Sequence, residues 1–442
     1  MMSKNVCMFV WNNFTNDARV LRECTALSEE GYKVDLICIH DPTDKKMKFE
    51  EKRSENFNVF RVRRYPILFT ILQSCLRICL KYKSVGGVAA FIWLFSVYFQ
   101  PLATLSLTFL GLLLLKTKVK TVFIRGSIIC RMIIMGSKKK YDLYHSNDLN
   151  TLPQGFICSK WRLKKKALIY DSHEVQTSRT GYDSPIYGMM EQFFIKRIDS
   201  MIVENHTRAK YNEDLYGFYP NVVHNYPFLQ SEVSNETINL HRMLQLPVNE
   251  KILLYQGGIQ AGRGLKQLIQ AVPKFKAGTL VLIGDGRIKP DLEKMVKEMN
   301  LQEKVRFIPK VPLTELPKYT KNAYIGFQVL NNTNFNHYSA SSNKLFEYMM
   351  AGVPVVACDF PEIKRVIEGE NTGICIDSHN PSAIADAVNR LIENSELHNQ
   401  LRENSLKASE IYNWESEKGL FLNVYTKRMS AYFKAMETTI SH

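Results

Sequence analysis

The chain has 442 residues, of which 45% are hydrophobic and 23% charged, with a formal net charge of +15. This length predicts two or three domains that each bury a core, and the composition excludes a disordered chain and a small disulfide scaffold. The nine cysteines are scattered and form no CxxC pair. That pattern argues against a zinc ribbon or a secreted disulfide framework and favours a reducing cytoplasm.

The first 225 residues alternate between strands and helices. A strand is predicted over 6–11, a helix over 13–31 capped by Thr15 or Asn16, and a strand over 32–40. This βαβ opening predicts a parallel sheet. Further short strands are expected within KTVFIRG (120–126), YDLYHSND (141–148), KALIYDSHE (166–174) and SMIVEN (200–205).

Polar residues follow several of these strands. In open α/β sheets, ligands bind at the carboxyl ends of the strands, so these side chains are expected to face one crevice. They are His145, Asp148, Asp171, His173, Glu174 and Glu204. No HxH, HExxH or DxD spacing is present, so we expect neither a metal site nor a resident cofactor.

The positive charge is concentrated in one stretch. Residues 60–166 hold 19 Lys or Arg residues but only two Asp or Glu residues. This local excess indicates an anionic partner at that stretch, such as a nucleic acid or a membrane surface. Basic motifs interleaved with aromatic residues are absent from the sequence, so no nucleic-acid partner is expected.

The same stretch contains an uncharged run from Ser84 to Leu115. Its length alone suggests a transmembrane helix, but Pro101 interrupts it, and strands of one sheet are predicted on both sides. Two readings remain: a hairpin that enters one leaflet, or a helix pair buried in the core. The basic flanks favour the first, and with it a cytoplasmic protein held peripherally, as a monotopic protein, at the anionic inner face of a membrane.

After a linker over 221–230, the strand–helix pattern restarts. Strands are predicted at KILLYQGG (251–258), TLVLIGDG (279–286), VRFIPKV (305–311), AYIGFQV (323–329) and VPVVACD (353–359). The chain therefore divides into a first domain over 1–225 with an insertion at about 60–140, a second domain over 226–412, and a terminal helix within 413–442.

Two runs of the second domain suit a phosphorylated ligand. LLYQGGIQAGRGLKQLI places glycines around Arg263 between a strand and a helix, where backbone N–H groups approach an anion, although an ordinary flexible turn would look the same. In SSNKLFEYMMAGVPVV, Lys344 and Glu347 share one face near the start of a helix. A lysine there can meet phosphate and a carboxylate can accept sugar hydroxyls, while an ordinary intrahelical ion pair is the alternative.

The runs NFTNDARV, HSND, DSHEV, YQGGIQAGRGLKQLI, LIGDG and NKLFEYMMAGVPVVACDFPEI occur in this order. Together they resemble the family 4 glycosyltransferases, which are retaining enzymes of GT-B architecture. The resemblance implies an α/β fold of two facing, doubly wound, Rossmann-like domains, with a C-terminal helix that crosses back to the first. It also implies transfer of a sugar from a nucleotide sugar, UDP-linked in our reading. The basic and apolar composition of residues 60–166 adds the expectation of a lipid-linked or glycan acceptor held at the membrane.

The resemblance assigns roles by position. His173 matches the active-site histidine. Gly258 stands where the family usually has an arginine, and Ser339 where it has the first of two glutamates. The implied donor-binding residues are Gly257, Gly258, Arg263, Gly284, Lys310, Val311, Ser339, Asn343, Lys344 and Glu347; the acceptor-side candidates are Asn16, His145, Asp148 and Glu174.

Two alternative functions remain. A nucleotide-sugar epimerase or hydrolase of the same fold would need no lipid acceptor, so the apolar insertion counts against it. A degenerate, non-catalytic membrane partner is favoured by Gly258 and Ser339. The residues that count against it are His173, Arg263, Lys344 and Glu347.

Overall fold

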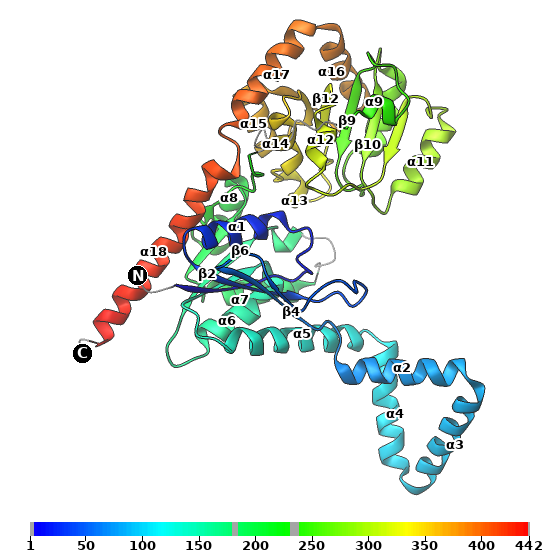
Figure 1. The fold of residues 1–442 in the computed structure, drawn as a ribbon, viewed down its shortest axis with the longest axis vertical. Helices are drawn as coiled ribbons and strands as arrows, with labels where there is room; N and C mark the ends of the chain where they lie inside the picture. The colour runs from blue at the N-terminus through cyan, green and yellow to red at the C-terminus, as the bar shows by residue number, and fades with distance from the viewer. Residues whose placement is uncertain (1–3, 179–183, 230–237, 441–442) are drawn as a thin grey trace.

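The computed structural model describes residues 4–178, 184–229 and 238–440, which form two α/β domains, a projecting arm and a terminal helix (Figure 1). The first domain has an eight-stranded sheet in the order β3-β4-β2-β1-β5-β6-β7-β8, parallel except for the β3–β4 pair. Its strands are β1 Asn5–Phe9, β2 Lys33–Ile39, β3 Glu50–Lys52, β4 Phe57–Val62, β5 Leu143–Asn147, β6 Ala167–Ser172, β7 Ser200–Val203 and β8 Asn221–Val222.

Helices cover both faces of this sheet. They are α1 Ala18–Glu29, α5 Val119–Ser137, α6 Leu152–Lys160, α7 Pro185–Ile195 and α8 His206–Tyr216. Helix α1 is capped by Asp17, whose Oδ1 accepts a hydrogen bond from the Val20 N–H at 3.1 Å, so the predicted caps Thr15 and Asn16 were wrong. Gly31, with φ +83°, follows α1 and turns the chain into β2.

The second domain has a six-stranded parallel sheet in the order β11-β10-β9-β12-β13-β14. Its strands are β9 Ile252–Gln256, β10 Thr279–Ile283, β11 Val305–Ile308, β12 Ile325–Gln328, β13 Val355–Cys358 and β14 Gly373–Ile376. Its helices are α9 Leu240–Met243, α10 Leu265–Ala271, α11 Lys289–Glu298, α12 Leu316–Thr320, α13 Phe335–Tyr338, α14 Asn343–Met350, α15 Pro361–Glu370, α16 Pro381–Glu393 and α17 Ser395–Ser409.

Both sheets reverse their strand order at a central pair, β1–β5 in the first domain and β9–β12 in the second. Such a switch point leaves a crevice at the carboxyl ends of the strands, where doubly wound folds bind ligands. The predicted doubly wound α/β fold is confirmed. The shared plan brings the two ligand-binding edges face to face.

One predicted strand was wrong. Thr121–Ile124 lies inside α5 rather than in the sheet. The buried residues of α5 are Ile128, Met132 and Gly136, which recur every four residues as on one face of a helix. Their packing against the core of the first domain outweighs the preference of the short Thr-Val-Phe-Ile run for a strand.

The chain ends in α18, which spans Trp414–Ile440 and runs alongside the first domain (Figure 1). Its Trp414, Phe421 and Tyr425 are buried in the same core cluster as Val6 and Met8 of β1. Residues of α18 thus complete the core of the first domain, although α18 directly follows the second domain in the chain.

Residues 67–116, here called the arm, form α2 Ile67–Lys81, α3 Lys83–Phe99 and α4 Pro101–Lys116. The arm projects from the first domain (Figure 1), and none of the residues of α3 is buried. Tyr98 and Leu102 are 82% and 84% exposed. The alternative of a helix pair buried in the core was therefore wrong.

Within the described residues, none of the helices is by itself long and apolar enough to span a bilayer. Phe69–Lys81 and Lys83–Phe99 meet that requirement only as a pair, and they are bent by 116° at the break between them.

Candidate active site between the two domains

A cavity of about 1090 Å³ lies between the domains. The first domain contributes the segment after β1 and the start of α1, together with His173 and Glu204 after β6 and β7. The second domain contributes Asn343 and Glu347 at the start of α14 and a loop that begins at Pro312. The cavity is therefore bounded by the carboxyl ends of the strands of both sheets. We call the side formed by the first domain the first wall and the side formed by the second domain the second wall.

His173 lies on the first wall and is held by two polar neighbours. Its Nε2 is 3.0 Å from Asn147 Oδ1 and 3.3 Å from Asp171 Oδ2, and its backbone N–H donates to Asp148 Oδ1. Burial alone would lower the pKa of His173, but the carboxylates of Asp171 and Asp148 raise it to about 10. The imidazole is therefore a cation at neutral pH.

Asp171 is itself anchored by α1. The Nε and Nη2 atoms of Arg19 donate to its two oxygens at 2.8 and 2.9 Å. Burial would raise the pKa of Asp171, but Arg19 and His173 hold it well below its usual range. A bidentate ion pair of this kind fixes both groups, so the sheet and α1 together set the position of the His173 ring.

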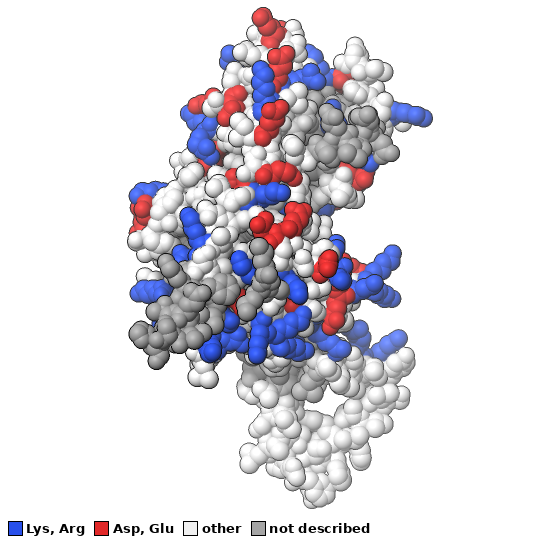
Figure 2. Space-filling view, turned by 60° about the vertical axis from the view of Figure 1, so that its left-hand side comes forward, with Lys and Arg blue, Asp and Glu red and all other residues white. Residues whose placement is uncertain are grey.

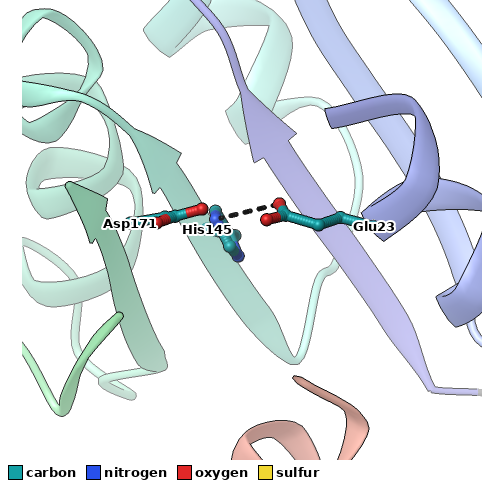
Figure 3. Close-up of side chains that lie close together, drawn as sticks. All are labelled: Glu23, His145 and Asp171. Carbon is teal, nitrogen blue, oxygen red and sulfur yellow. Dashed lines mark ion pairs between the residues drawn. The ribbon is translucent and has the colours of Figure 1, made fainter. Parts of the chain in front are cut away.

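Beneath this pair lies a buried trio of Glu23, His145 and Asp171 (Figure 3), whose ligand-type atoms lie within 4.8 Å of one another. The spacing resembles a metal site, but the residues present do not fit a divalent cation. The Arg19 guanidinium already occupies Asp171 and lies 3.1 Å from Glu23 Oε1. Burial and the charge of Asp171 raise the pKa of Glu23, which favours a neutral carboxyl there.

His145 is not available to an acceptor in this arrangement, contrary to our expectation. Its side chain is 0% exposed, and its Nδ1 lies 2.5 Å from the hydroxyl of Tyr425 on α18. Burial lowers its pKa to about 4, so it is a neutral group at neutral pH. Because it lies in the middle of a central strand, its side chain enters the layer between the sheet and the helices rather than the crevice.

The second wall is built on α14. The carboxylate of Glu347 accepts a hydrogen bond from Gln256 Nε2 at 2.6 Å, and the ammonium of Lys344 lies 4.1 Å from the centre of the Tyr255 ring. Burial raises the pKa of Glu347. Burial and the charge of Arg263 hold the pKa of Lys344 well below its usual range. Among the residues that the structure describes, neither Lys344 nor Glu347 has an ion-pair partner like those of the first wall.

Glycines after β9 and β10 allow two turns of the backbone to pack closely together beside Lys344. Gly257 and Gly284 have φ values of +132° and +150°. A Cβ atom on Gly284 would lie 2.0 Å from the carbonyl oxygen of Gly257, so only glycine fits there. Lys344 Nζ would lie 3.3 Å from a Cβ on Gly257, which places the ammonium at the end of β9 beside the Gly257–Gly258 turn.

Ser339 lies elsewhere than expected. It is 0% exposed and does not line the cavity. Its hydroxyl accepts a hydrogen bond from Arg208 Nε at 3.1 Å, and its carbonyl accepts one from Asn205 Nδ2 at 2.7 Å. Both partners belong to the first domain. The residue that replaces the family's first glutamate therefore forms part of a contact between the domains.

Other predicted residues divide between the cavity and its surroundings. Asn16, Asn343 and Glu347 line the cavity, whereas Asp148 and Glu174 do not. The other predicted donor-side residues that do not line it are Gly257, Gly258, Arg263, Gly284 and Lys344. Lys310 is exposed and its backbone N–H donates to Asp285 Oδ2, and Val311 packs partly buried against the core. The cavity wall begins one residue later, at Pro312.

Several cavity residues were missed by the sequence reading. Arg22, on the exposed-looking start of α1, is only 2% exposed, its guanidinium donates to Asn225 Oδ1, and its Nε has no partner among the described residues. Burial and the charge of Arg19 lower the pKa of Arg22 to about 10. The Arg19–Arg22 spacing at i, i+3 was the signal that a helical reading of this segment could have used.

The fold and this interdomain cavity define a GT-B protein, and comparisons with known proteins agree. The model of the family Glycosyl transferases group 1 matches residues 237–408, which make up most of the second domain. The resemblance recognised in the sequence is confirmed.

Among curated relatives, an uncharacterized glycosyltransferase of Methanocaldococcus jannaschii is 28% identical over 194 residues, covering 43% of this chain and 48% of that protein. A D-inositol 3-phosphate glycosyltransferase of Nocardioides sp. is 25% identical over 259 residues, covering 54% and 55%. The chain thus spans about half the length of these relatives.

Solved structures share the fold over nearly the whole chain. Sucrose-phosphate synthase from Thermosynechococcus elongatus has a TM-score of 0.72 at 16% identity and covers 97% of this chain and 100% of its own. The Anabaena protein Alr3699/HepE in complex with UDP has a TM-score of 0.66 at 14% identity, and the match covers 96% of this chain and 100% of that protein.

Proposed function

We propose that this protein transfers a sugar from a UDP-linked donor to a lipid-linked or glycan acceptor held at an anionic membrane surface. The observation that carries the proposal is the juxtaposition, across one cavity, of Glu347 at the start of α14 with the cationic His173. The similar proteins support the donor class, since Alr3699/HepE is described in complex with UDP and with UDP-glucose.

On the second wall, the donor diphosphate would lie near Lys344, Arg263 and the first turn of α14. An anion there offsets the mutual repulsion of the two cations and interacts favourably with the helix N-terminus. Glu347 would accept hydrogen bonds from the ribose hydroxyls. Burial disfavours the charged form of Lys344. A bound phosphate would raise the pKa of Lys344 again and keep its ammonium group charged.

On the first wall, His173 would donate from Nδ1 to the transferred sugar, because Nε2 already faces Asn147 and Asp171. A histidine with a pKa of about 10 is a poor general base at neutral pH, so we assign it electrostatic and positioning work. In the reaction the bond from the anomeric carbon to the diphosphate oxygen breaks, a bond to the acceptor oxygen forms, and the acceptor hydroxyl proton leaves with the diphosphate or to solvent.

The acceptor would approach from the first domain. Asn16, Arg22 and Arg53 line that side of the cavity. Two guanidinium groups suit an acceptor that carries phosphate, as a lipid-linked glycan does. The exposed arm would rest in the headgroup region of one leaflet, and its basic flanks would bind anionic lipids. No resident cofactor is required, because the nucleotide sugar is a co-substrate.

The test is turnover by the full chain. Purified protein is mixed with UDP-sugars and a membrane lipid extract, and released UDP is measured. We expect release that depends on both donor and extract and falls at least 100-fold in Glu347→Gln, but stays unchanged in the control Glu368→Gln, an exposed residue of the same domain. Release without any acceptor would instead indicate a hydrolase, and binding without release would indicate a non-catalytic partner.

A further inference from the structure

A second pocket, of about 330 Å³, lies at the base of the arm. It is lined by the end of β4 and the segment that leads from it toward the arm, by one face of α5, and by Phe49. Its eight lining residues are Phe49, Arg61, Val62, Arg63, Arg131, Ile134, Met135 and Lys138. None of them belongs to the interdomain cavity, so this is a separate site.

The pocket is strongly cationic. It has four basic lining residues and no Asp or Glu. Arg61 is paired with Glu51, whose Oε2 lies 3.0 Å from its Nη1 and whose Oε1 lies 2.8 Å from Arg53 Nε. In the part of the chain that the structure describes, Arg63, Arg131 and Lys138 form no ion pair; Arg131 Nη1 donates only to the Arg63 carbonyl and to Ser127 Oγ. Three cations thus face one small space without a counter-charge.

The energetics of Arg131 agree with this geometry. Burial and the nearby charge of Arg63 lower the pKa of Arg131, so its cation is less stable there than in a freely solvated arginine. A phosphate oxygen between the guanidinium groups of Arg63 and Arg131 would stabilise both cations, because guanidinium groups bind phosphate by paired hydrogen bonds.

The remaining lining is apolar. Phe49 and Ile134 are exposed, while Val62 is buried and Met135 partly buried. Arg63 lies four residues before Ile67, where the exposed apolar surface of the arm begins. Figure 2 shows Lys and Arg side chains gathered along the lower edge of the first domain, above an arm that is almost free of charge. An anion that also has an apolar portion matches this combination.

We propose that this pocket binds the phosphate of an anionic phospholipid from the leaflet on which the arm rests. The headgroup phosphate would lie between Arg63, Arg131 and Lys138, and the glycerol and upper acyl carbons would lie against Phe49 and Ile134. This inference rests on the membrane association in the proposed function, and it adds a defined lipid site to a surface that otherwise binds only by diffuse charge. It does not depend on the transfer reaction.

The site is tested on the full chain with soluble short-chain lipids. Isothermal titration is performed with dihexanoyl phosphatidylglycerol, with dihexanoyl phosphatidylcholine and with inorganic phosphate. The two lipids share their acyl chains, so binding to the apolar arm contributes equally to both. We expect one saturable site for phosphatidylglycerol per chain, at least tenfold tighter than binding of phosphatidylcholine or of inorganic phosphate.

Two variants locate the site. Arg63→Gln combined with Arg131→Gln should weaken phosphatidylglycerol binding at least tenfold, whereas Lys81→Gln with Lys83→Gln, which removes two exposed charges from the arm, should leave it within twofold. If the double variant unfolds, Arg63→Gln alone replaces it in the test, because Arg63 is exposed and its substitution should not affect folding. Equal losses in both pairs would overturn the proposal, since they indicate diffuse electrostatics.

Two further outcomes bear on the lipid itself. Inorganic phosphate that binds as tightly as phosphatidylglycerol would overturn the assignment to a lipid and leave a free-phosphate site. The thermal shift caused by UDP-sugars serves as a separate readout of the interdomain cavity. It should persist in Arg63→Gln with Arg131→Gln, which separates failure of the lipid site from failure of the proposed function.

Discussion

The two walls of the interdomain cavity differ in how their charges are compensated. On the first wall, Arg19, Asp171 and His173 form a closed chain of ion pairs. Behind the second wall, Lys344 is buried beside the Tyr255 ring and near the like charge of Arg263, and neither of these two cations lines the cavity. The first wall is thus organised before any substrate arrives, whereas our proposal predicts that the second would gain stability when an anion binds.

The crossovers of the two domains differ as well. The connection from β11 to β12 spans residues 309–324 and holds only the short helix α12. The equivalent connection from β4 to β5 spans residues 63–142 and holds the arm and α5. Apart from the extra edge strands β3 and β8 of the first sheet, the two sheets keep the same order in spite of this, so the arm is an addition to the fold and not a part of its core.

The largest effect is expected from breaking the first wall. Arg19→Ala leaves Asp171 buried without its partner, which should lower the free energy of unfolding by about 3–5 kcal/mol. Chemical denaturation measures it. The control is Lys294→Ala, which breaks the exposed pair with Glu298 and should change stability by less than about 1 kcal/mol. Similar small changes in both variants would contradict the contrast between the walls.

The second wall should behave in the opposite way. Lys344→Gln removes a buried cation without a tight partner, so the melting temperature should stay the same or rise. Affinity for a UDP-sugar should fall by about 100-fold, the worth of a charge-assisted hydrogen bond to phosphate. Titration calorimetry measures this, with the exposed Lys364→Gln as control. A large loss of stability with unchanged affinity would make Lys344 a structural residue.

The pH dependence of stability should report on His173. Its folded pKa of about 10 lies above the unfolded value of about 6.5, so its stabilisation is complete below pH 6.5 and is lost as the pH rises toward 10. In wild type the unfolding free energy should fall over that range by up to about 1.4 kcal/mol per pH unit. His173→Gln should flatten this part of the profile, and an unchanged slope would refute the assignment.

The smallest effect on stability is expected in the arm. Leu102→Ser alters a residue that is 84% exposed, so the free energy of unfolding should change by less than about 0.5 kcal/mol. Leu254→Ala in β9, at 0% exposure, should cost about 2–5 kcal/mol. Denaturation of both variants checks this. A comparable loss in Leu102→Ser would mean that the arm packs on a surface of its own chain.

The sequence predicted most of the framework because its signals are local. The strands β1, β2, β5 and β6 are short apolar runs bounded by turns, and α14 carries a helical apolar face next to Lys344 and Glu347. The strand wrongly expected at 121–124 shows the limit of a short run. Its helix is revealed only by the spacing of buried positions further along α5.

The site was less predictable because its contacts join distant parts of the chain. The ion pair between Arg19 and Asp171 links residues 152 positions apart, and the contact between Arg208 and Ser339 links two domains. Position after a strand suggested a role for His145, but strand pleating decides which side chains reach the crevice, and His145 faces α18 instead.

The most direct test of the account is titration calorimetry of UDP-sugars against the full chain and against one variant of each wall, Glu347→Gln and His173→Gln. The account predicts one binding site per chain for at least one UDP-sugar, weakened in both variants, because the donor would touch both walls. Binding that survives both substitutions unchanged, or the absence of binding by every UDP-sugar, would contradict it.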